Sequence, residues 1–449
     1  MKISLVKKKA WLPIVVGLSL TSIISTGVSA DNISLEQVTA DITFLASDKL
    51  AGRATFSEGI DEAADYISKR FSDIGLSPLK GLSGFKQTFE ISQFIPDSID
   101  LTLNGRNIAK ENLTMASTIE SIVWNSSKQF ETTVISAKDN MRKMVGDLNQ
   151  QGGKHLVLLD TAHAKLFKRY QSYFQRGLTK LDLNHQGAII VVLTDEVSID
   201  SIDLKATVTI RKQSLSNVVG VLPGKTRKEE IVLYSAHYDH LGVKSSEGKD
   251  DSDLIYNGAD DDASGTTAVI NLAEYFAKKA DNARTLIFTA FTAEEIGGFG
   301  SRYLSGKLKP DNISAMINIE MIGKPSKFGK GTLWMTGMQR SDLGALLNAG
   351  LKEQKIEIYQ DPYPEQGLFY RSDNATLARL GVPAHSFSST QLDKDQHYHQ
   401  VSDDVKSLDL ESMQRVIETL SIATEGLVKG RDTPTRLDTS KIKRKGKIY

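Results

Sequence analysis

The chain has 449 residues, of which 40% are hydrophobic and 24% charged, with 55 basic and 55 acidic side chains and no cysteine. This composition is typical of a globular protein, and the length predicts two structural units or one large enzyme domain with an insertion. The balanced charge argues against binding nucleic acid through a basic surface. The lack of cysteine excludes disulfides, thiolate nucleophiles, thiolate zinc sites and iron–sulfur clusters. Any metal must therefore be bound by His, Asp and Glu.

Residues 1–30 have the pattern of a secretory signal peptide. Four lysines precede a mostly apolar stretch from Ala10 to Ile24, and Val28-Ser29-Ala30 supplies small residues for cleavage after Ala30. The apolar stretch is short for a membrane span. Cleavage after Ala30 would leave a mature chain with a net charge of −4, because residues 1–30 carry four Lys and no acidic residue. We therefore expect an exported protein, periplasmic or secreted, with no membrane attachment after cleavage.

Two helices are predicted between residues 34 and 79, because apolar residues such as Leu35, Val38 and Ile42 recur at helical spacing. The next region differs in texture. It holds predicted strands at 98–105, 155–159 and 188–193 but no cluster of acids and histidines with ligand spacing. We predict that residues 31–92 begin the catalytic domain and that residues 93–214 form a separate, inserted β-rich domain without catalytic residues.

From residue 217 onward, predicted strands alternate with predicted helices. The strands lie at 217–222, 231–236, 285–291, 314–319, 332–336 and 382–387, and the helices at 263–279, 342–353, 374–380 and 410–428. This alternation predicts an α/β fold, a three-layer sandwich with a largely parallel mixed sheet, over a catalytic domain at 215–430. Residues 431–449 are polar and basic and are predicted to be a loose tail.

Polar motifs follow several of these strands, at the sheet edge where open α/β sheets form their sites. They are His237-Tyr238-Asp239-His240, the acidic triplet Asp260-Asp261-Asp262 that opens a helix, Glu294-Glu295, Glu320, and His397-Tyr398-His399 with Asp403. Each motif alone is commonly a cap or a solvated loop. Together they supply the His and carboxylate ligands that suit zinc. Two neighbouring metals would need a bridging carboxylate, which the acidic triplet can supply.

These motifs resemble the M28 family of zinc aminopeptidases, which are di-zinc exopeptidases. The resemblance covers residues 35–92 and 215–428, and it includes Leu50-Ala51-Gly52-Arg53, Gln87-Thr88-Phe89 and Arg371-Ser372-Asp373. Residues 93–214 are similar in position and texture to the protease-associated domain inserted in many members. The resemblance implies that the protein removes N-terminal amino acids from peptides by attack of a metal-activated water.

The resemblance also implies two Zn²⁺ per chain and a role for each matched residue. His237 and Glu320 match ligands of one zinc, Glu295 and His399 match ligands of the other, and Asp261 matches the bridging carboxylate. Glu294 matches the general base, Asp239 the residue that orients His237, and Asp403 a further residue behind the ligands. Tyr370, Tyr398 and Arg371 are candidates for contact with the oxyanion or the substrate.

Two positions depart from the family pattern. Glu320 stands where the family commonly has Asp, and its side chain is one methylene longer. We expect this difference to affect the affinity for that zinc, and therefore whether both metals are always present. Asn374 stands where the family frequently has His, and we expect this difference to modulate the activity rather than abolish it. The pocket for the substrate side chain is expected to include residues 362–371 and 385–396.

Other functions are compatible with the same fold. A single-zinc glutaminyl cyclase and a carboxypeptidase or dipeptidase, with Arg371 binding a carboxylate, are alternatives within the family. A non-catalytic binding relative is disfavoured because every ligand position holds a residue able to bind zinc. Gly224-Lys225-Thr226 is not a P-loop, since the required upstream glycine is Val219. The chain also contains no Gly-x-Ser-x-Gly nucleophile elbow.

Overall fold

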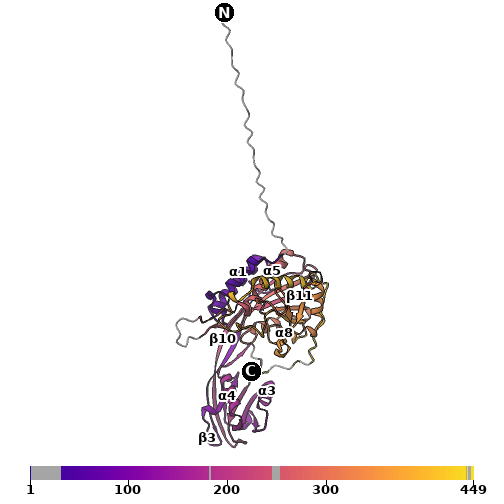
Figure 1. Cartoon of the computed structure of the whole chain (residues 1–449). Coiled ribbons are helices and arrows are strands. Elements are labelled where there is room, and N and C mark those ends of the chain that lie inside the picture. The colour runs from indigo at the N-terminus through magenta and orange to yellow at the C-terminus, as the bar shows by residue number, and fades with distance from the viewer. Residues whose placement is uncertain (2–31, 182–183, 245–252, 441, 443–445) are drawn as a thin grey trace.

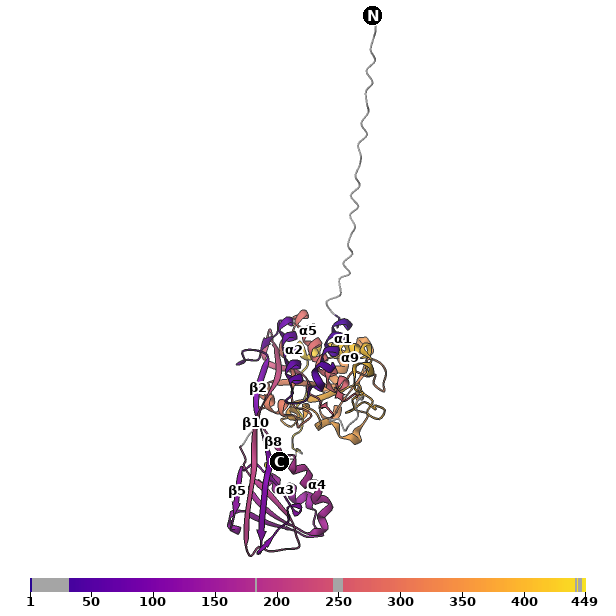
Figure 2. The same ribbon diagram turned by 90° about the vertical axis from the view of Figure 1, so that its left-hand side faces the viewer.

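The computed structural model describes residues 1, 32–181, 184–244, 253–440, 442 and 446–449. The predicted signal peptide therefore lies outside the described residues, except for its first residue. A main body and an inserted unit are joined by two long strands, β2 (Lys86–Leu103) and β10 (Ile202–Leu222) (Figures 1 and 2). Among the described helices, none is long and apolar enough to cross a membrane.

The main body is built on a mixed sheet of 12 strands. Its centre consists of four parallel neighbours, in the order β14 (Arg284–Phe291), β11 (Arg227–His237), β15 (Ile313–Ile319) and β18 (Ala384–Ser388). Helices cover both faces of these strands, which explains their nearly continuous apolar runs. The prediction of an α/β sandwich with a largely parallel mixed sheet is confirmed.

The two sides of this central sheet are antiparallel additions. On one side β16 (Leu333–Met335) runs antiparallel to β18, and β17 (Ile358–Gln360) runs parallel to β16. On the other side β10 runs antiparallel to β14 and pairs in turn with β2. The remaining short strands are β1 (Ser77–Pro78), β3 (Arg106–Asn107), β8 (Leu178–Lys180), and the separate pair β12 (Gly242–Val243) and β13 (Ile255–Tyr256).

The larger helical layer packs its apolar stripes on one face of the sheet and forms the main core with it. Its helices are α1 (Leu35–Leu45), α2 (Glu58–Ile74), α5 (Gly265–Lys279), α7 (Leu343–Gly350), α9 (Leu410–Ala423) and α10 (Glu425–Val428). The opposite face is covered by the shorter α6 (Phe299–Ser305) and α8 (Asn374–Ala378). The sequence did not indicate α6, because this short helix begins beside the flexible pair Gly297-Gly298 and contains another glycine.

The inserted unit has its own sheet and its own core. The sheet order is β4 (Leu113–Ser117), β9 (Ala188–Leu193), β7 (Lys154–Leu159) and β6 (Glu131–Ile135), while β5 (Ser121–Trp124) pairs with β10. Two helices, α3 (Met141–Gln151) and α4 (Ala164–Gln175), accompany these strands. The unit is thus mixed α/β, with helices that the predicted β-rich texture did not include. Its assignment as a protease-associated domain stays a prediction.

The C-terminal residues, predicted to be a loose tail, make specific contacts where the structure describes them. The Arg436 guanidinium donates to the Ile313 carbonyl (2.9 Å), and Ile448 is buried in the core of the inserted unit. The Asn149 side chain accepts from the backbone N–H groups of Ile448 and Tyr449, each at 2.8 Å. A few apolar residues in an otherwise polar segment therefore fix its end against the inserted unit.

Candidate metal centre

The carboxyl ends of β11, β14 and β15 place the candidate residues at one edge of the sheet. The parallel register pairs His237 with Phe291, three residues before Glu294, and Glu320 directly follows β15. The acidic triplet lies in a π-helical turn, Ala259–Ser264, that leads into α5. A loop before α9 carries His399. Segments that are distant in sequence therefore meet at the edge where α/β sheets form their sites.

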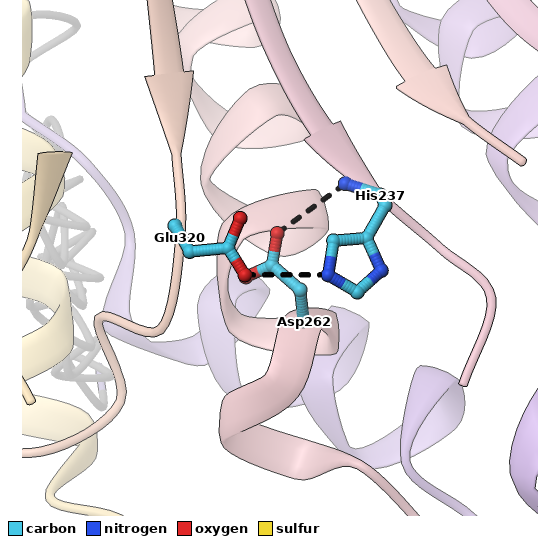
Figure 3. Close-up of side chains that lie close together, drawn as sticks. All are labelled: His237, Asp262 and Glu320. Carbon is cyan, nitrogen blue, oxygen red and sulfur yellow. Dashed lines mark hydrogen bonds and ion pairs between the residues drawn. The ribbon is translucent and has the colours of Figure 1, made fainter. Parts of the chain in front are cut away.

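The first cluster centres on His237. Its Nε2 lies 3.2 Å from Asp261 Oδ1 and 3.3 Å from Glu320 Oε1. Figure 3 shows the His237 ring facing Glu320 while Asp262 lies beside both residues. The Ser372 hydroxyl donates to the other Glu320 oxygen at 2.6 Å. The longer side chain of Glu320 thus still reaches His237, and Ser372 holds it there.

The second cluster lies on the other side of Asp261. His399 Nε2 is 3.1 Å from Asp261 Oδ2 and 3.5 Å from Glu295 Oε2. Asp261 therefore directs one oxygen toward His237 and the other toward His399. This is the arrangement required of a carboxylate that bridges two cations.

Two residues that the sequence analysis did not place among the ligands belong to these clusters. His240 is buried, and its Nδ1 lies 2.9 Å from Glu295 Oε1. Its position in the motif that begins with His237 was the available signal. Asp262 accepts hydrogen bonds from the backbone N–H groups of His237, Gly265 and Met321 (3.0–3.3 Å). It therefore joins three site segments, and the Asp261–Asp262 peptide bond is cis.

Two further carboxylates hold the ligand segments from behind. Asp239 accepts hydrogen bonds from the backbone N–H groups of Glu294 (3.1 Å) and Glu295 (3.2 Å). One of its oxygens lies 3.7 Å from His237 Nδ1, which also contacts the Asp239 carbonyl at 3.1 Å. Asp403 accepts from the backbone N–H groups of Asp260 and Asp261. These contacts fix the backbone that presents the clusters.

The N-terminal segment also supports the site, through Arg53. This side chain is fully buried and donates to the carbonyl oxygens of Tyr238 (2.8 Å) and Gly258 (2.9 Å). It therefore connects the turn between the first two helices with two of the loops around the clusters. Gly52, next to it, has a φ of +71° and would place a Cβ within 2.5 Å of backbone atoms of Gly242 and Tyr256. Only glycine fits this close approach.

Glu294 lies beside the two clusters on the wall of a cleft. Burial raises the pKa of its carboxyl well above the usual range, His237 opposes the shift, and Asp373 and Glu320 add to it. Such a raised pKa is typical of a residue that exchanges protons during catalysis. A cation bound in the clusters would lower this pKa again, because it stabilises the nearby negative charge.

The cleft has a volume of about 530 Å³ and is lined by residues of both clusters. The two predicted pocket segments contribute to it through Gln366, Leu368, Arg371, Ser386, Ser388, Leu392 and Asp395. Tyr398, stacked on His399, also lines the cleft. Tyr370 does not line it. Its ring packs against Phe369 and lies beside two arginine side chains, which places it in a packing role.

Asn374, the second departure from the family pattern, has a bracing role. Its side-chain amide donates to the carbonyl oxygens of Phe369 (2.8 Å) and Ala384 (3.2 Å). It thereby ties the start of α8 to the loop that carries Arg371. His385, on the neighbouring strand, lies apart from the clusters and hydrogen-bonds Thr336 and Ser341.

The donor groups of the two clusters suit divalent cations. Donor atoms of His237, Asp262 and Glu320 lie within 4.8 Å of one another, and so do those of His240, Asp261 and Glu295. Hydrogen bonds to Asp261 and Glu295 raise the pKa of His399 to about 10, so the buried carboxylates hold positive charge at this position. A cation would supply that charge in place of the proton. His–carboxylate sets without sulfur are compatible with zinc.

The fold and the paired clusters define an α/β protein with a candidate two-metal centre at the carboxyl edge of its sheet. Residues 217–424 match Peptidase family M28. The residues of both clusters thus lie in the part of the chain that matches this family, as the motifs predicted.

Curated relatives agree with this assignment. A probable zinc metalloprotease of Leptosphaeria maculans is 34% identical over 111 residues, which cover 24% of this chain and 25% of that protein. Leucine aminopeptidase 1 of Ajellomyces dermatitidis is 30% identical over 226 residues, which cover 46% of this chain and 55% of that protein. The chain thus spans between a quarter and about half of the length of these two relatives.

Solved structures share the fold over a longer stretch. An aminopeptidase from Aneurinibacillus sp. strain AM-1 aligns with a TM-score of 0.53 at 17% identity and covers 92% of this chain and 98% of its own. BSAP, a zinc aminopeptidase from Bacillus subtilis, aligns with a TM-score of 0.52 at 15% identity, covering 90% and 97%. Because these alignments leave out a tenth of this chain or less, the shared fold extends into the inserted unit.

Proposed function

We propose that this protein is a zinc-dependent exopeptidase that removes N-terminal amino acids from peptides and holds two zinc ions. The observation that carries the proposal is the placement of Asp261, whose two oxygens face His237 and His399. The M28 match over residues 217–424 and the names of the relatives support the same reaction class.

Each ion would be held by residues from different segments of the chain. His237, Asp261 and Glu320 would hold one ion, and Asp261, Glu295 and His399 the other. His240 would hold the Glu295 carboxylate through its Nδ1. Bound zinc supplies a Lewis acid that polarises a carbonyl group and lowers the pKa of water.

Glu294 would act as general base and then as general acid. Its carboxylate lies on the cleft wall and is held by the loop that Asp239 fixes through two backbone N–H groups. In this position it takes a proton from the attacking water and passes it to the nitrogen of the leaving amine. Burial raises the proton affinity of Glu294, which favours the first of these transfers.

The cleft would accept a substrate with a free N-terminus, as the names of the aminopeptidase relatives suggest. Five carboxylates line it, from Asp261, Glu294, Glu295, Glu320 and Asp395, against the single guanidinium of Arg371. Two bound zinc ions would offset this excess of about four negative charges, so the net charge of the cleft does not by itself select the substrate. We also propose export to the periplasm or medium, on the pattern of residues 1–30.

A metal analysis combined with activity profiling tests the proposal. Purified protein is expected to contain two zinc ions per chain and to hydrolyse peptides with a free N-terminus, and its activity on the N-acetylated forms of those peptides should be lost. Activity on the N-acetylated peptides would contradict the aminopeptidase proposal. If that activity then depended on a free C-terminus and on Arg371, it would favour the carboxypeptidase alternative.

A further inference from the structure

Lys324 is a buried cation near the metal centre that the proposed chemistry does not use. It follows β15, four residues after Glu320, and only 13% of its side chain is exposed. Its Nζ lies 2.8 Å from Asp395 Oδ1, 3.2 Å from Asp260 Oδ2 and 3.8 Å from Asp403 Oδ1. One ammonium group therefore faces three carboxylates whose side chains are at most 3% exposed.

Asp403 and Asp260 hold the backbone of the acidic turn. Asp403 accepts from the N–H groups of Asp260 and Asp261, which orients the carboxylate that lies between the two clusters. Asp260 accepts from the Gly323 N–H (2.8 Å) and from the Thr390 hydroxyl (2.6 Å). The turn is thereby tied to the end of β15 and to the loop after β18.

The third carboxylate, Asp395, holds the loop that carries His399. It accepts hydrogen bonds from the backbone N–H groups of His397 (3.3 Å) and Tyr398 (3.0 Å). Lys324 thus joins the His399 loop to the turn that presents Asp261. In the described part of the chain, it is the only Lys or Arg within ion-pair distance of Asp260, Asp395 and Asp403.

We infer that Lys324 is a positioning residue that keeps His399 and Asp261 at binding distance for the second metal ion. The inference rests on the proposed two-metal function. Without the ammonium group, three buried carboxylates would face one another with no cation between them, and they would repel one another and move apart. His237 and Glu320 depend less on Lys324, because they sit at strand ends and are held by contacts with Asp239 and Ser372.

The test compares zinc binding by the wild type, Lys324→Met and Lys324→Arg. Stoichiometry and affinity are measured by competition with a chromophoric chelator, independently of activity. In Lys324→Met we expect the ion at His399 to bind at least about 10-fold more weakly, the usual size of an effect transmitted through a ligand's supporting residues. The other ion shares Asp261 but keeps His237 and Glu320, so its affinity should fall by a smaller factor. Lys324→Arg, which retains the positive charge, should recover part of the lost affinity.

Arg70→Met is the matched control for a general loss of stability. Arg70 is also 13% exposed and pairs with a buried carboxylate, Asp41, and with Glu274, but it lies among α1, α2 and α5. Arg70→Met should lower the melting temperature, while both zinc ions should bind with wild-type affinity. Because Lys324→Met could unfold, Asp395→Asn provides a milder variant. It removes one charged partner and should weaken binding of the ion at His399 to a smaller extent.

Three outcomes separate the inference from the function on which it rests. If both ions bind Lys324→Met and Asp395→Asn with wild-type affinity, the inference is wrong. It is also wrong if Lys324→Met and Arg70→Met both lower the affinity for the two ions by the same factor, because the effect would then be a general loss of stability. If the wild type itself binds no second zinc, the two-metal proposal fails, independently of Lys324.

Discussion

The main body and the inserted unit both contain parallel strands that end in polar residues, but only the main body gathers these residues into a site. In the inserted unit, Asp139, Asp160 and Asp195 follow the parallel strands β6, β7 and β9. Asp139 accepts from Ser136, Asp160 from the Ala162 N–H, and Asp195 from the Thr161 hydroxyl. Each carboxylate is thus satisfied by its own turn or a neighbouring one.

One carboxyl group from each region shows how the surroundings shift a pKa in opposite directions. Hydrogen bonds from Ser136 lower the pKa of Asp139, which is exposed to solvent. Burial and neighbouring carboxylates raise the pKa of Glu294. A position at the end of a parallel strand is therefore insufficient to make a site. The side chains must also converge, be buried and lack enough local donors to satisfy their charge.

The largest expected effect comes from Glu294→Gln. The amide has nearly the same shape but cannot accept a proton, so kcat should fall by about 10² to 10⁴-fold. Zinc content should remain at the wild-type level. Asp139→Asn, in the inserted unit, is the matched carboxylate-to-amide control and should leave kcat within about 2-fold. A wild-type kcat in Glu294→Gln would refute the general-base role.

The next largest effect is expected on zinc affinity, when His240 is substituted. His240→Leu removes the nitrogen that contacts Glu295 at 2.9 Å, and one ion should bind about 10- to 100-fold more weakly. His240→Asn places an amide N–H near the position of Nδ1 and should lose less affinity. Chelator competition measures both variants. Equal affinities in His240→Leu and the wild type would show that His240 only fills space.

The acid stability of the main body should depend on His385. Burial lowers the pKa of this imidazole to about 4, with Arg340 adding to the effect and the bond to Thr336 opposing it. The unfolded chain binds a proton near the ordinary pKa of about 6.5, so stability is lost as the pH falls from there toward 4. Between pH 7 and pH 5 the loss should be about 2 kcal/mol.

His385→Asn is the test variant, because its amide can still donate to the Thr336 carbonyl but does not titrate. Urea unfolding at pH 7 and pH 5 measures the change in free energy for both proteins. The wild type should lose more stability than the variant across this interval. Identical losses would mean that His385 is not protonated on unfolding in this range.

The smallest effect is expected in the inserted unit. Asp160→Ala removes the carboxylate that caps the turn after β7 and should cost about 1 kcal/mol of stability. Zinc content and kcat should not change, since this carboxylate contacts neither cluster. A loss of zinc in Asp160→Ala would show that the two regions are coupled, contrary to the comparison.

The apolar strands could be predicted well because their pattern is local. The runs at 231–236, 285–291 and 314–319 are covered by helices on both faces, so their sequences are apolar throughout. β10 was predicted only from residue 217, although it begins at Ile202. Its first half alternates apolar and polar residues, and only its pairing with β2 shows that both halves are one strand.

The site could be predicted only in part, for a similar reason. The structure brings six of the predicted residues to one cleft: His237, Asp261, Glu294, Glu295, Glu320 and His399. The motifs of the first five follow a strand or open a helix, whereas His399 lies in a loop between β18 and α9. The role of Lys324 had no local signal, because its partners at 260, 395 and 403 are far apart in the chain. Tyr370 was a candidate for contact with the oxyanion, but its ring packs against Phe369 and is not among the residues that line the cleft.

The sequence by itself determined the α/β class, the order of the central strands along the chain and a set of candidate metal ligands without cysteine. These follow from local hydrophobic patterns and residue types. Only the tertiary structure decided which oxygen of Asp261 faces which histidine, that His240 contacts Glu295, and that Lys324 joins three distant carboxylates. These contacts depend on distances of a few ångström between segments whose separation along the chain carries no such information.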